Sequence, residues 1–254
     1  MDLGKKANQF RSELVKFKTS TGSGHLASSL SIVDVLISIY IDDATYFEHK
    51  NDVLVFGKAH GGPALYPILV DLGYFDAEEL DKYCLPNGIL RMHPDKSIPG
   101  CSYVGGSLGN GIGFAAGLAW AERSKQNIII LGDAELYEGS VWESLMFIAH
   151  WKLNNLLIIV DRNGLGILGP TEELLRLEPL DQKFRSFGFD VLEVNGHDFE
   201  DLRKAMANPP KNPTVIIANT VKAKGVDFME NRAEYHTIIP REASVIATML
   251  EGLK

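Results

Sequence analysis

Five short segments of the chain are apolar almost throughout and lack a regular alternation of polar and apolar residues. A strand that is buried on both faces has this pattern, because neither of its faces meets water. We therefore predict β-strands that are covered on both sides. They span Asp52–Phe56, Asn127–Leu131, Leu156–Val160, Asp190–Val194 and Thr214–Ala218.

The segments before and between these strands have apolar residues at the spacing typical of helices. The predicted helices span Ser31–Ile41, Ser107–Arg123, Val141–Lys152 and Glu200–Ala207. Alternating strands and helices predict an α/β fold with a doubly wound, mostly parallel sheet. A chain of 254 residues has enough material for one large core, so we expect a single domain over residues 1–254.

One long interval has no clear periodicity. Leu85–Gly106 contains three prolines and four glycines, which predicts a long ordered loop, and loops of this length commonly carry function.

Composition narrows the classes of function. The 25 basic and 33 acidic residues give a net charge of −8, which argues against a nucleic-acid binder, since that needs clustered lysine and arginine. The aliphatic runs Ile128–Leu131 and Leu156–Val160 are far shorter than the roughly 20 residues that span a bilayer. Cys84 and Cys101 fit neither a disulfide framework nor a metal motif. We expect a cytoplasmic protein with no membrane or nucleic-acid partner.

Oxygen-bearing side chains follow two of the predicted strands. Asp133 comes after the strand that ends at Leu131, and Asn163 follows the strand that ends at Val160. Because parallel strands end at the same edge of a sheet, both side chains should face one crevice. A carboxylate, an amide and a backbone carbonyl after Asn163, with two diphosphate oxygens and a water, would complete the octahedron that Mg²⁺ prefers.

This arrangement resembles the thiamin diphosphate motif, and the residues within it are similar to those of the transketolase family. The resemblance extends along nearly the whole chain through further motifs in family order. They are Ser23-Gly24-His25, Lys58-Ala59-His60-Gly61-Gly62-Pro63-Ala64-Leu65-Tyr66, Met92-His93-Pro94-Asp95, Gly105-Gly106-Ser107-Leu108-Gly109-Asn110-Gly111, and Val221-Lys222-Ala223-Lys224-Gly225-Val226-Asp227-Phe228-Met229-Glu230 with the later His236.

The resemblance implies a role for each matching residue. The metal, Mg²⁺ or Ca²⁺, would be held by Asp133, Asn163 and the carbonyl of Leu165. Thiamin diphosphate would be bound by His60, Gly106, Leu108, Gly132, Asp133, Ala134 and Asn163. The catalytic residues around the reacting carbon would be His25, His93 and His236. A histidine can equally be a hydrogen-bonded structural residue, which is our interpretation of His49, His150 and His197.

Glycines and departures from the family pattern leave alternatives open. Gly105, Gly106, Gly109 and Gly111 could serve turns and helix packing, although close approach to a cofactor is the favoured interpretation. A nicotinamide site is disfavoured, because no acidic residue closes a ribose site. Ala134 replaces a usual glycine, and Leu26-Ala27 replaces Pro-Gly after His25. Leu168 replaces an acid, which puts the local polar network and the standard sugar substrate in question.

The implied reaction is transfer of a two-carbon ketol unit from a ketose, often a sugar phosphate, to an aldose. In this family the activating glutamate lies in a pyrimidine-binding domain, so we expect it on a separate C-terminal subunit, with two such pairs forming a heterotetramer. Glu138 resembles a residue that contacts its symmetry mate, or it is simply an acid at a helix N-terminus. The alternatives are a specialised two-carbon transferase of secondary metabolism or sugar catabolism, and an inactive assembly partner.

Overall fold

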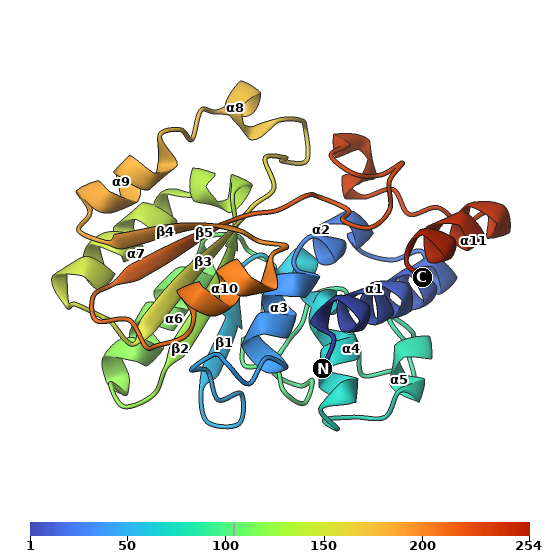
Figure 1. Ribbon diagram of the computed structural model, residues 1–254, viewed down its shortest axis with the longest axis horizontal. Coiled ribbons are helices and arrows are strands. Elements are labelled where there is room, and N and C mark those ends of the chain that lie inside the picture. Colours follow the sequence, from blue (N-terminus) through green and yellow to red (C-terminus); the bar gives the residue numbers. More distant parts are fainter. Residues whose placement is uncertain (104) are drawn as a thin grey trace.

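The computed structural model describes residues 1–103 and 105–254 (Figure 1). In this part the chain forms a five-stranded parallel sheet in the order β1-β2-β3-β5-β4. The strands are β1 (Val53–Phe56), β2 (Asn127–Gly132), β3 (Leu156–Arg162), β4 (Asp190–Asn195) and β5 (Thr214–Asn219). The predicted α/β class and parallel sheet are confirmed.

All five predicted strands exist, but one prediction about their burial was wrong. β2 is buried along its whole length, as expected, whereas β4 lies at an edge of the sheet and is largely exposed. In β4 only Val191 and Val194 are buried, and Leu192 is 41% exposed. Edge position alone does not cause this exposure, because β1 at the opposite edge is largely buried, and a short apolar run does not show which edge is covered.

Helices surround the sheet, and 3-10 turns join several of the segments. The helices are α1 (Leu3–Thr21), α2 (Leu26–Leu30), α3 (Val33–Tyr40), α4 (Leu65–Asp71), α5 (Glu78–Asp81), α6 (Asn110–Ala121), α7 (Gly139–His150), α8 (Thr171–Leu174), α9 (Leu180–Ser186), α10 (Phe199–Ala205) and α11 (Ala243–Gly252). The 3-10 turns are η1 (Ala59–Ala64), η2 (Ala134–Tyr137) and η3 (Ala233–His236).

The four predicted helices correspond to α3, α6, α7 and α10. The short helix α2, which follows His25 directly, was not among the predicted helices. Apart from residue 104, the predicted loop 85–106 contains no helix or strand.

The direction of the chain explains which helices cover which face. β1, β2 and β3 follow one another across the sheet, and the chain then passes to the edge strand β4 and returns to β5. Right-handed crossovers place helices on one face while the chain advances and on the other face when it reverses. Accordingly α6, α7 and α9 cover one face, whereas α10 joins α1, α3 and α4 on the other (Figure 1).

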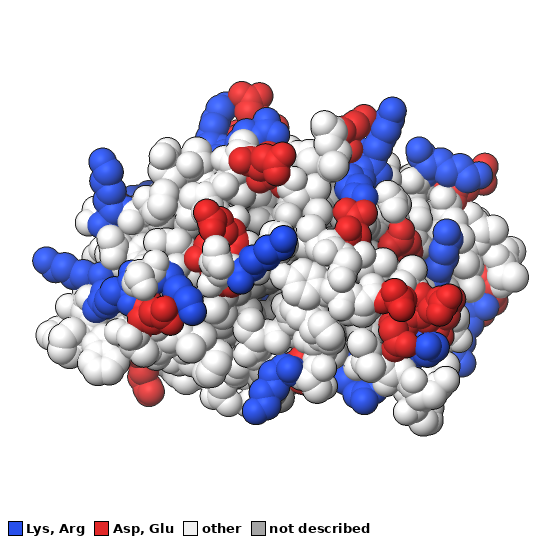
Figure 2. Space-filling model, turned by 90° about the horizontal axis from the view of Figure 1, so that it is seen from below, with Lys and Arg blue, Asp and Glu red and all other residues white. Residues whose placement is uncertain are grey.

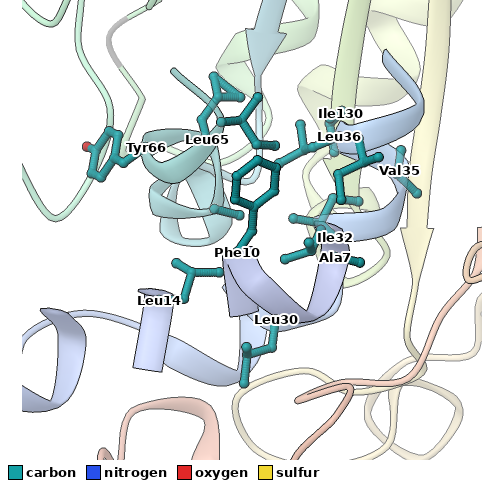
Figure 3. Close-up of a cluster of buried hydrophobic side chains, with 14 of the residues drawn as sticks. Ala7, Phe10, Leu14, Leu30, Ile32, Val35, Leu36, Leu65, Tyr66 and Ile130 are labelled. Carbon is teal, nitrogen blue, oxygen red and sulfur yellow. The ribbon is translucent and has the colours of Figure 1, made fainter. Parts of the chain in front are cut away.

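Successive residues of the central strands face opposite hydrophobic clusters. Ile128 and Ile130 of β2 belong to the cluster with α1, α3 and α4, whereas Ile129 and Leu131 belong to the cluster with α6 and α7. In the first cluster, Phe10 of α1 points toward side chains from α3, α4 and β2 (Figure 3). Helices therefore pack on both faces of the sheet and hold the strands in place. The carboxyl ends of these strands form a rigid edge.

The surface carries charges of both signs. Figure 2 shows basic and acidic side chains interspersed on one face of the molecule. No helix in the described residues combines the length and apolar character needed to cross a membrane. Cys84 and Cys101 are both free thiols.

Candidate active site

A cavity of about 650 Å³ lies at the carboxyl ends of the central strands. Gly132 of β2 pairs with Asp161 of β3, and Arg162 of β3 pairs with Asn219 of β5, so these strand ends are level. Every site residue predicted from the sequence lines this cavity. They are His25, His60, His93, Gly106, Leu108, Gly132, Asp133, Ala134, Asn163, Leu165 and His236.

Asp133 presents a buried carboxylate beside the cavity. Its side chain is 2% exposed and accepts hydrogen bonds from the backbone N–H of Ala134 (2.8 Å) and Gly164 (2.6 Å). Burial, and then the negative charge of Asp161, raise the pKa of Asp133. Arg162 Nη1 lies 3.2 Å from Asp133 Oδ2 and offsets part of this charge. A cation in the cavity would stabilise the ionised carboxylate further.

Asn163 and Leu165 add two neutral oxygens to the same wall. Asn163 Nδ2 donates to Asp161 Oδ2 at 3.3 Å, and Asn163 Oδ1 accepts from the backbone N–H of Leu165 at 3.1 Å. Asp161 therefore fixes the orientation of the amide. The carbonyl of Leu165 accepts from Lys222 Nζ at 3.0 Å.

Four histidines, His25, His60, His93 and His236, lie close together, although they come from distant parts of the sequence. The ring centroid of His25 lies 5.4 Å from that of His60, 6.2 Å from His93 and 5.2 Å from His236. His60 and His236 are 5.5 Å apart. The start of α2, η1, the loop before α6 and η3 each supply one of these rings.

Burial lowers the pKa of all four imidazoles. The pKa of His25 falls to about 4 and that of His236 to about 3, and burial is the largest cause in both. His60 and His93 also have lowered pKa values for the same reason. Nearby lysines lower these pKa values further. All four rings are therefore neutral at pH 7, the form in which imidazole accepts a proton.

Lys58 and Asp161 form a buried ion pair that sequence reasoning did not predict. Their side chains are 1% and 0% exposed, and Lys58 lines the cavity. Asp161 also accepts from Ser31 Oγ at 2.8 Å and from the hydroxyl of Thr220. Lys58 and Asp161 both lie in segments that the sequence singled out for other residues. The two residues are 103 positions apart in the sequence, so only the fold brings them together.

Lys222 is a second functional candidate that was missed. It is 1% exposed, lines the cavity, and its Nζ lies 2.9 Å from His236 Nδ1. Burial lowers the pKa of Lys222 to about 8, and the charge of Lys58 is the second cause. The motif Val221 to Gly225 identified this segment, but no spacing rule pointed to the amine.

Glu135 fastens the glycine-rich segment to the end of β2. Its carboxylate accepts from the backbone N–H of Gly109 at 2.9 Å and of Gly132 at 3.1 Å. Burial raises the pKa of Glu135 to about 7. The carboxylate thus holds two parts of the cavity wall together.

The glycines of this segment do not share one purpose. A Cβ on Gly105 would lie 2.2 Å from Ala59 Cβ, and one on Gly109 would lie 2.5 Å from Ser140 Oγ, while one on Gly111 would lie 3.1 Å from Gly57 Cα. Close packing therefore accounts for these three glycines, contrary to the favoured interpretation. Gly106 is the member of the four that lines the cavity, with nothing nearer to a built Cβ than His93 Nδ1 at 3.7 Å among the described residues.

An apolar loop borders the opening of the cavity. Ile167, Leu168, Leu174 and Leu175 line the cavity and are between 41% and 82% exposed. Arg162 supports this loop by donating to Thr171 Oγ1 (2.7 Å) and Glu172 Oε1 (2.9 Å). The acid expected at position 168 is thus replaced by the most exposed apolar side chain of the loop.

The three remaining histidines lie outside the cavity lining. His49 Nδ1 contacts Tyr74 Oη at 3.2 Å. His150 is exposed at the end of α7. His197 accepts from the backbone N–H of Val221 at 2.8 Å through Nε2, so its Nδ1 carries the proton donated to Asp34. The contacts of His49 and His197 agree with the hydrogen-bonded structural roles predicted for them, whereas His150 is an exposed surface residue.

The donor set fits a hard divalent cation with a diphosphate. Within the described residues no three His, Cys, Asp or Glu side chains cluster as a metal site. The candidate ligands are instead one carboxylate, one amide oxygen and one carbonyl, and such a set leaves coordination positions for phosphate oxygens. Lys222, beside the Leu165 carbonyl, adds positive charge for an anion.

The fold and this site define a cofactor-binding α/β domain whose ligands lie at the strand ends. The particular family is identified by comparison with known proteins. Residues 5–250 match the family model described as transketolase, thiamine diphosphate binding domain. The chain belongs to this family.

Relatives of similar length are transketolase subunits. An apulose-4-phosphate transketolase subunit from Actinobacillus succinogenes is 36% identical over 266 residues, covering 100% of this chain and 96% of the relative. The 6-deoxy-6-sulfo-D-fructose transketolase subunit SqwG from a Clostridium species is 36% identical over 251 residues, covering 94% and 91%.

The same fold occurs in transketolases of greater length. The crystal structure of transketolase from Campylobacter jejuni superposes with a TM-score of 0.90 and 29% identity. The match covers 99% of this chain and 42% of that one, so the chain spans about two fifths of the solved transketolase.

Proposed function

We propose that this chain is the thiamin-diphosphate-anchoring subunit of a split transketolase that transfers a two-carbon ketol unit from a ketose donor to an aldose acceptor. The observation that carries the proposal is the meeting of four neutral histidines and three oxygen donors in one cavity. Membership of the family and relatives of matching length support it.

Asp133, Asn163 and the carbonyl of Leu165 would hold Mg²⁺ or Ca²⁺. Lys222 and the wall formed by Gly132, Ala134, Gly106, Leu108 and His60 would contact the cofactor. When bound, thiamin diphosphate supplies the electron sink for breaking a carbon–carbon bond beside a carbonyl. The protein has to orient the substrate and exclude water.

His25, His93 and His236 would manage protons at the substrate. Cleaving and forming a bond next to a carbinol requires a hydroxyl proton to leave and return, and a neutral imidazole does this near pH 7. Lys222 Nζ, 2.9 Å from His236 Nδ1, disfavours protonation of that ring and offers it a hydrogen bond. With Nδ1 accepting from Lys222, neutral His236 would carry its proton on Nε2 and donate a hydrogen bond from there to a substrate oxygen.

A second chain would complete the site. Solved transketolases of this fold are more than twice the length matched here, and relatives of this chain's size are named as subunits. We infer that a C-terminal subunit carries the pyrimidine-binding domain and the activating glutamate, and that two pairs form a heterotetramer. Glu138, exposed at the start of α7, would face the symmetry-related copy.

One observation favours a specialised substrate over the common sugar phosphates. Leu168 is 82% exposed at the mouth of the cavity, in an apolar loop with Ile167 and Leu174. The relatives act, by their names, on apulose 4-phosphate and on a sulfonated deoxysugar. The second candidate is therefore a ketol transferase with a modified donor or acceptor.

Reconstitution tests both candidates. The chain would be co-purified with its partner, and bound thiamin diphosphate measured by mass spectrometry. A panel of ketose phosphates, branched sugar phosphates and sulfonated sugars would then be screened with several aldose acceptors. Ketol transfer from some donor supports the proposal, and the preferred donor separates the two candidates. A complex without cofactor and without transfer contradicts it.

A further inference from the structure

A second fully buried lysine lies close to the histidine cluster but, unlike Lys58, has no anionic partner among the described residues. Lys18 belongs to the last turn of α1 and is 0% exposed. Within the described part of the chain its Nζ makes one side-chain hydrogen bond, to Tyr83 Oη at 3.4 Å, and no salt bridge. An ammonium group buried in this way is costly unless it can lose its proton.

The amine packs directly against the turn that carries His25. A Cβ built on Gly24 would lie 2.8 Å from Lys18 Nζ and 2.6 Å from Tyr83 Oη, so only glycine fits there. Gly24 also has a φ of +91°, a conformation that favours glycine. Lys18 therefore sits beneath the backbone that positions His25, whose ring is 6.2 Å from that of His93.

The groups around the amine are neutral or basic. Tyr83 and Cys84, on the segment after α5, both have pKa values raised by burial and carry no charge near pH 7. The charge of Lys18 acts on His25 and His93, and His25 also lies among the basic or titratable side chains of Lys58, Lys222, His60 and His236. A proton that reaches this region therefore meets several competing bases.

Lys18 holds a proton more readily than the imidazoles of His25 and His93, while Lys222, with a pKa of about 8, holds one more readily still. Burial lowers the pKa of Lys18 to about 7, whereas burial and then the charge of Lys18 lower the pKa of His25 to about 4. The same two causes lower the pKa of His93. As pH falls, the amine is charged before the imidazoles, and its charge then opposes their protonation.

We propose that Lys18 is a positioning residue whose buried amine takes up a proton before His25 and His93 do and thereby keeps these two imidazoles neutral. The proposal rests on the proposed function, in which these two imidazoles accept substrate protons. Lys18 acts on them through space and does not line the cavity. It extends the pH range in which the two rings can work toward lower pH.

The test is a histidine titration by NMR on the full chain without cofactor, substrate or partner. In the Lys18→Met variant the midpoints of His25 and His93 should move upward by about one pH unit, a tenfold gain in proton affinity. His150, exposed at the end of α7, should not move. Lys16→Met, which changes an exposed lysine on the same helix, should leave all midpoints in place. Unchanged midpoints for His25 and His93 in a folded Lys18→Met variant would overturn the proposal.

A second measurement covers the case in which that variant does not fold. In the unaltered chain with isotope-labelled lysine, the Lys18 amine should titrate near neutral pH. A Lys18 amine that keeps its proton to about pH 10, the range of an unperturbed lysine, would show that the proposal is wrong. Neither experiment depends on activity, so a negative result leaves the proposed ketol transfer standing and can be told apart from its failure.

Discussion

Lys58 and Asp161 form an ion pair in which neither side chain is more than 1% exposed. The pair connects the ends of β1 and β3 at the base of the cavity, and Asp161 in turn orients the amide of Asn163. The same carboxylate thus serves both the stability of the fold and the geometry of the candidate metal site.

Lys58→Met should destabilise the chain by about 3 to 5 kcal/mol, because it leaves the carboxylate of Asp161 buried without its cation. Urea unfolding measures the loss. Lys204→Met is the matched control, since Lys204 pairs with Glu200 on the surface with both side chains more than two-thirds exposed, and exposed pairs contribute roughly 1 kcal/mol or less. Equal losses of unfolding free energy in the two variants would show that the buried pair contributes no more to stability than an exposed pair.

Asp133→Ala should abolish metal-dependent binding of thiamin diphosphate, because Asp133 is the one anionic side chain among the three proposed ligands from this chain. Calorimetry on the reconstituted complex, with and without Mg²⁺, measures the affinity. Asp76→Ala serves as the control, because it removes an exposed carboxylate that does not line the cavity. An Asp133→Ala variant with the affinity of the parent would rule out the metal assignment.

His93→Ala and His236→Ala should each reduce turnover by about 10²- to 10⁴-fold while thiamin diphosphate still binds, because these rings are placed around the substrate. Steady-state rates and cofactor affinity are measured on the same preparations. The control is His150→Ala, which removes a histidine outside the cavity. A variant that keeps the parent rate identifies its histidine as structural.

Glu135→Gln should change how stability depends on pH. Burial raises the folded-state pKa of Glu135 from 4.5 to about 7, so the protonated carboxyl is the form that the fold favours. Its contribution is complete below about pH 4.5 and is lost as pH rises through about 7. Over this window the parent should lose about 3 kcal/mol of unfolding free energy relative to the variant. Parallel pH profiles for the two proteins would show that Glu135 titrates normally.

The sequence predicted the parts of the molecule that depend on local pattern. Buried strands such as Asn127–Leu131 are recognisable because a short unbroken apolar run is typical of a strand covered on both faces. Asp133 and Asn163 could be placed because each comes shortly after the end of such a strand. The histidines were found through family motifs, since nothing in their spacing brings His25 and His236 together.

What could not be predicted depends on contacts between distant segments. The pairing of Lys58 with Asp161, the burial of Lys18 and the contact of Lys222 with His236 are set by tertiary packing and leave no periodic signal. The exposure of β4 depends on which neighbouring elements cover that strand, since β1 also lies at an edge and is largely buried, and the apolar residues Val191 and Val194 do not reveal this.

The central claim is that this chain holds half of an active site, and a titration of the purified chain with its partner subunit tests it most directly. Ketol transfer and sedimentation would be followed together, with thiamin diphosphate and Mg²⁺ in excess. We expect no transfer from the chain alone, and activity that rises in proportion to added partner until the two are equimolar. Full activity from the chain without a partner would contradict the account, because the activating glutamate would then have to lie within these 254 residues.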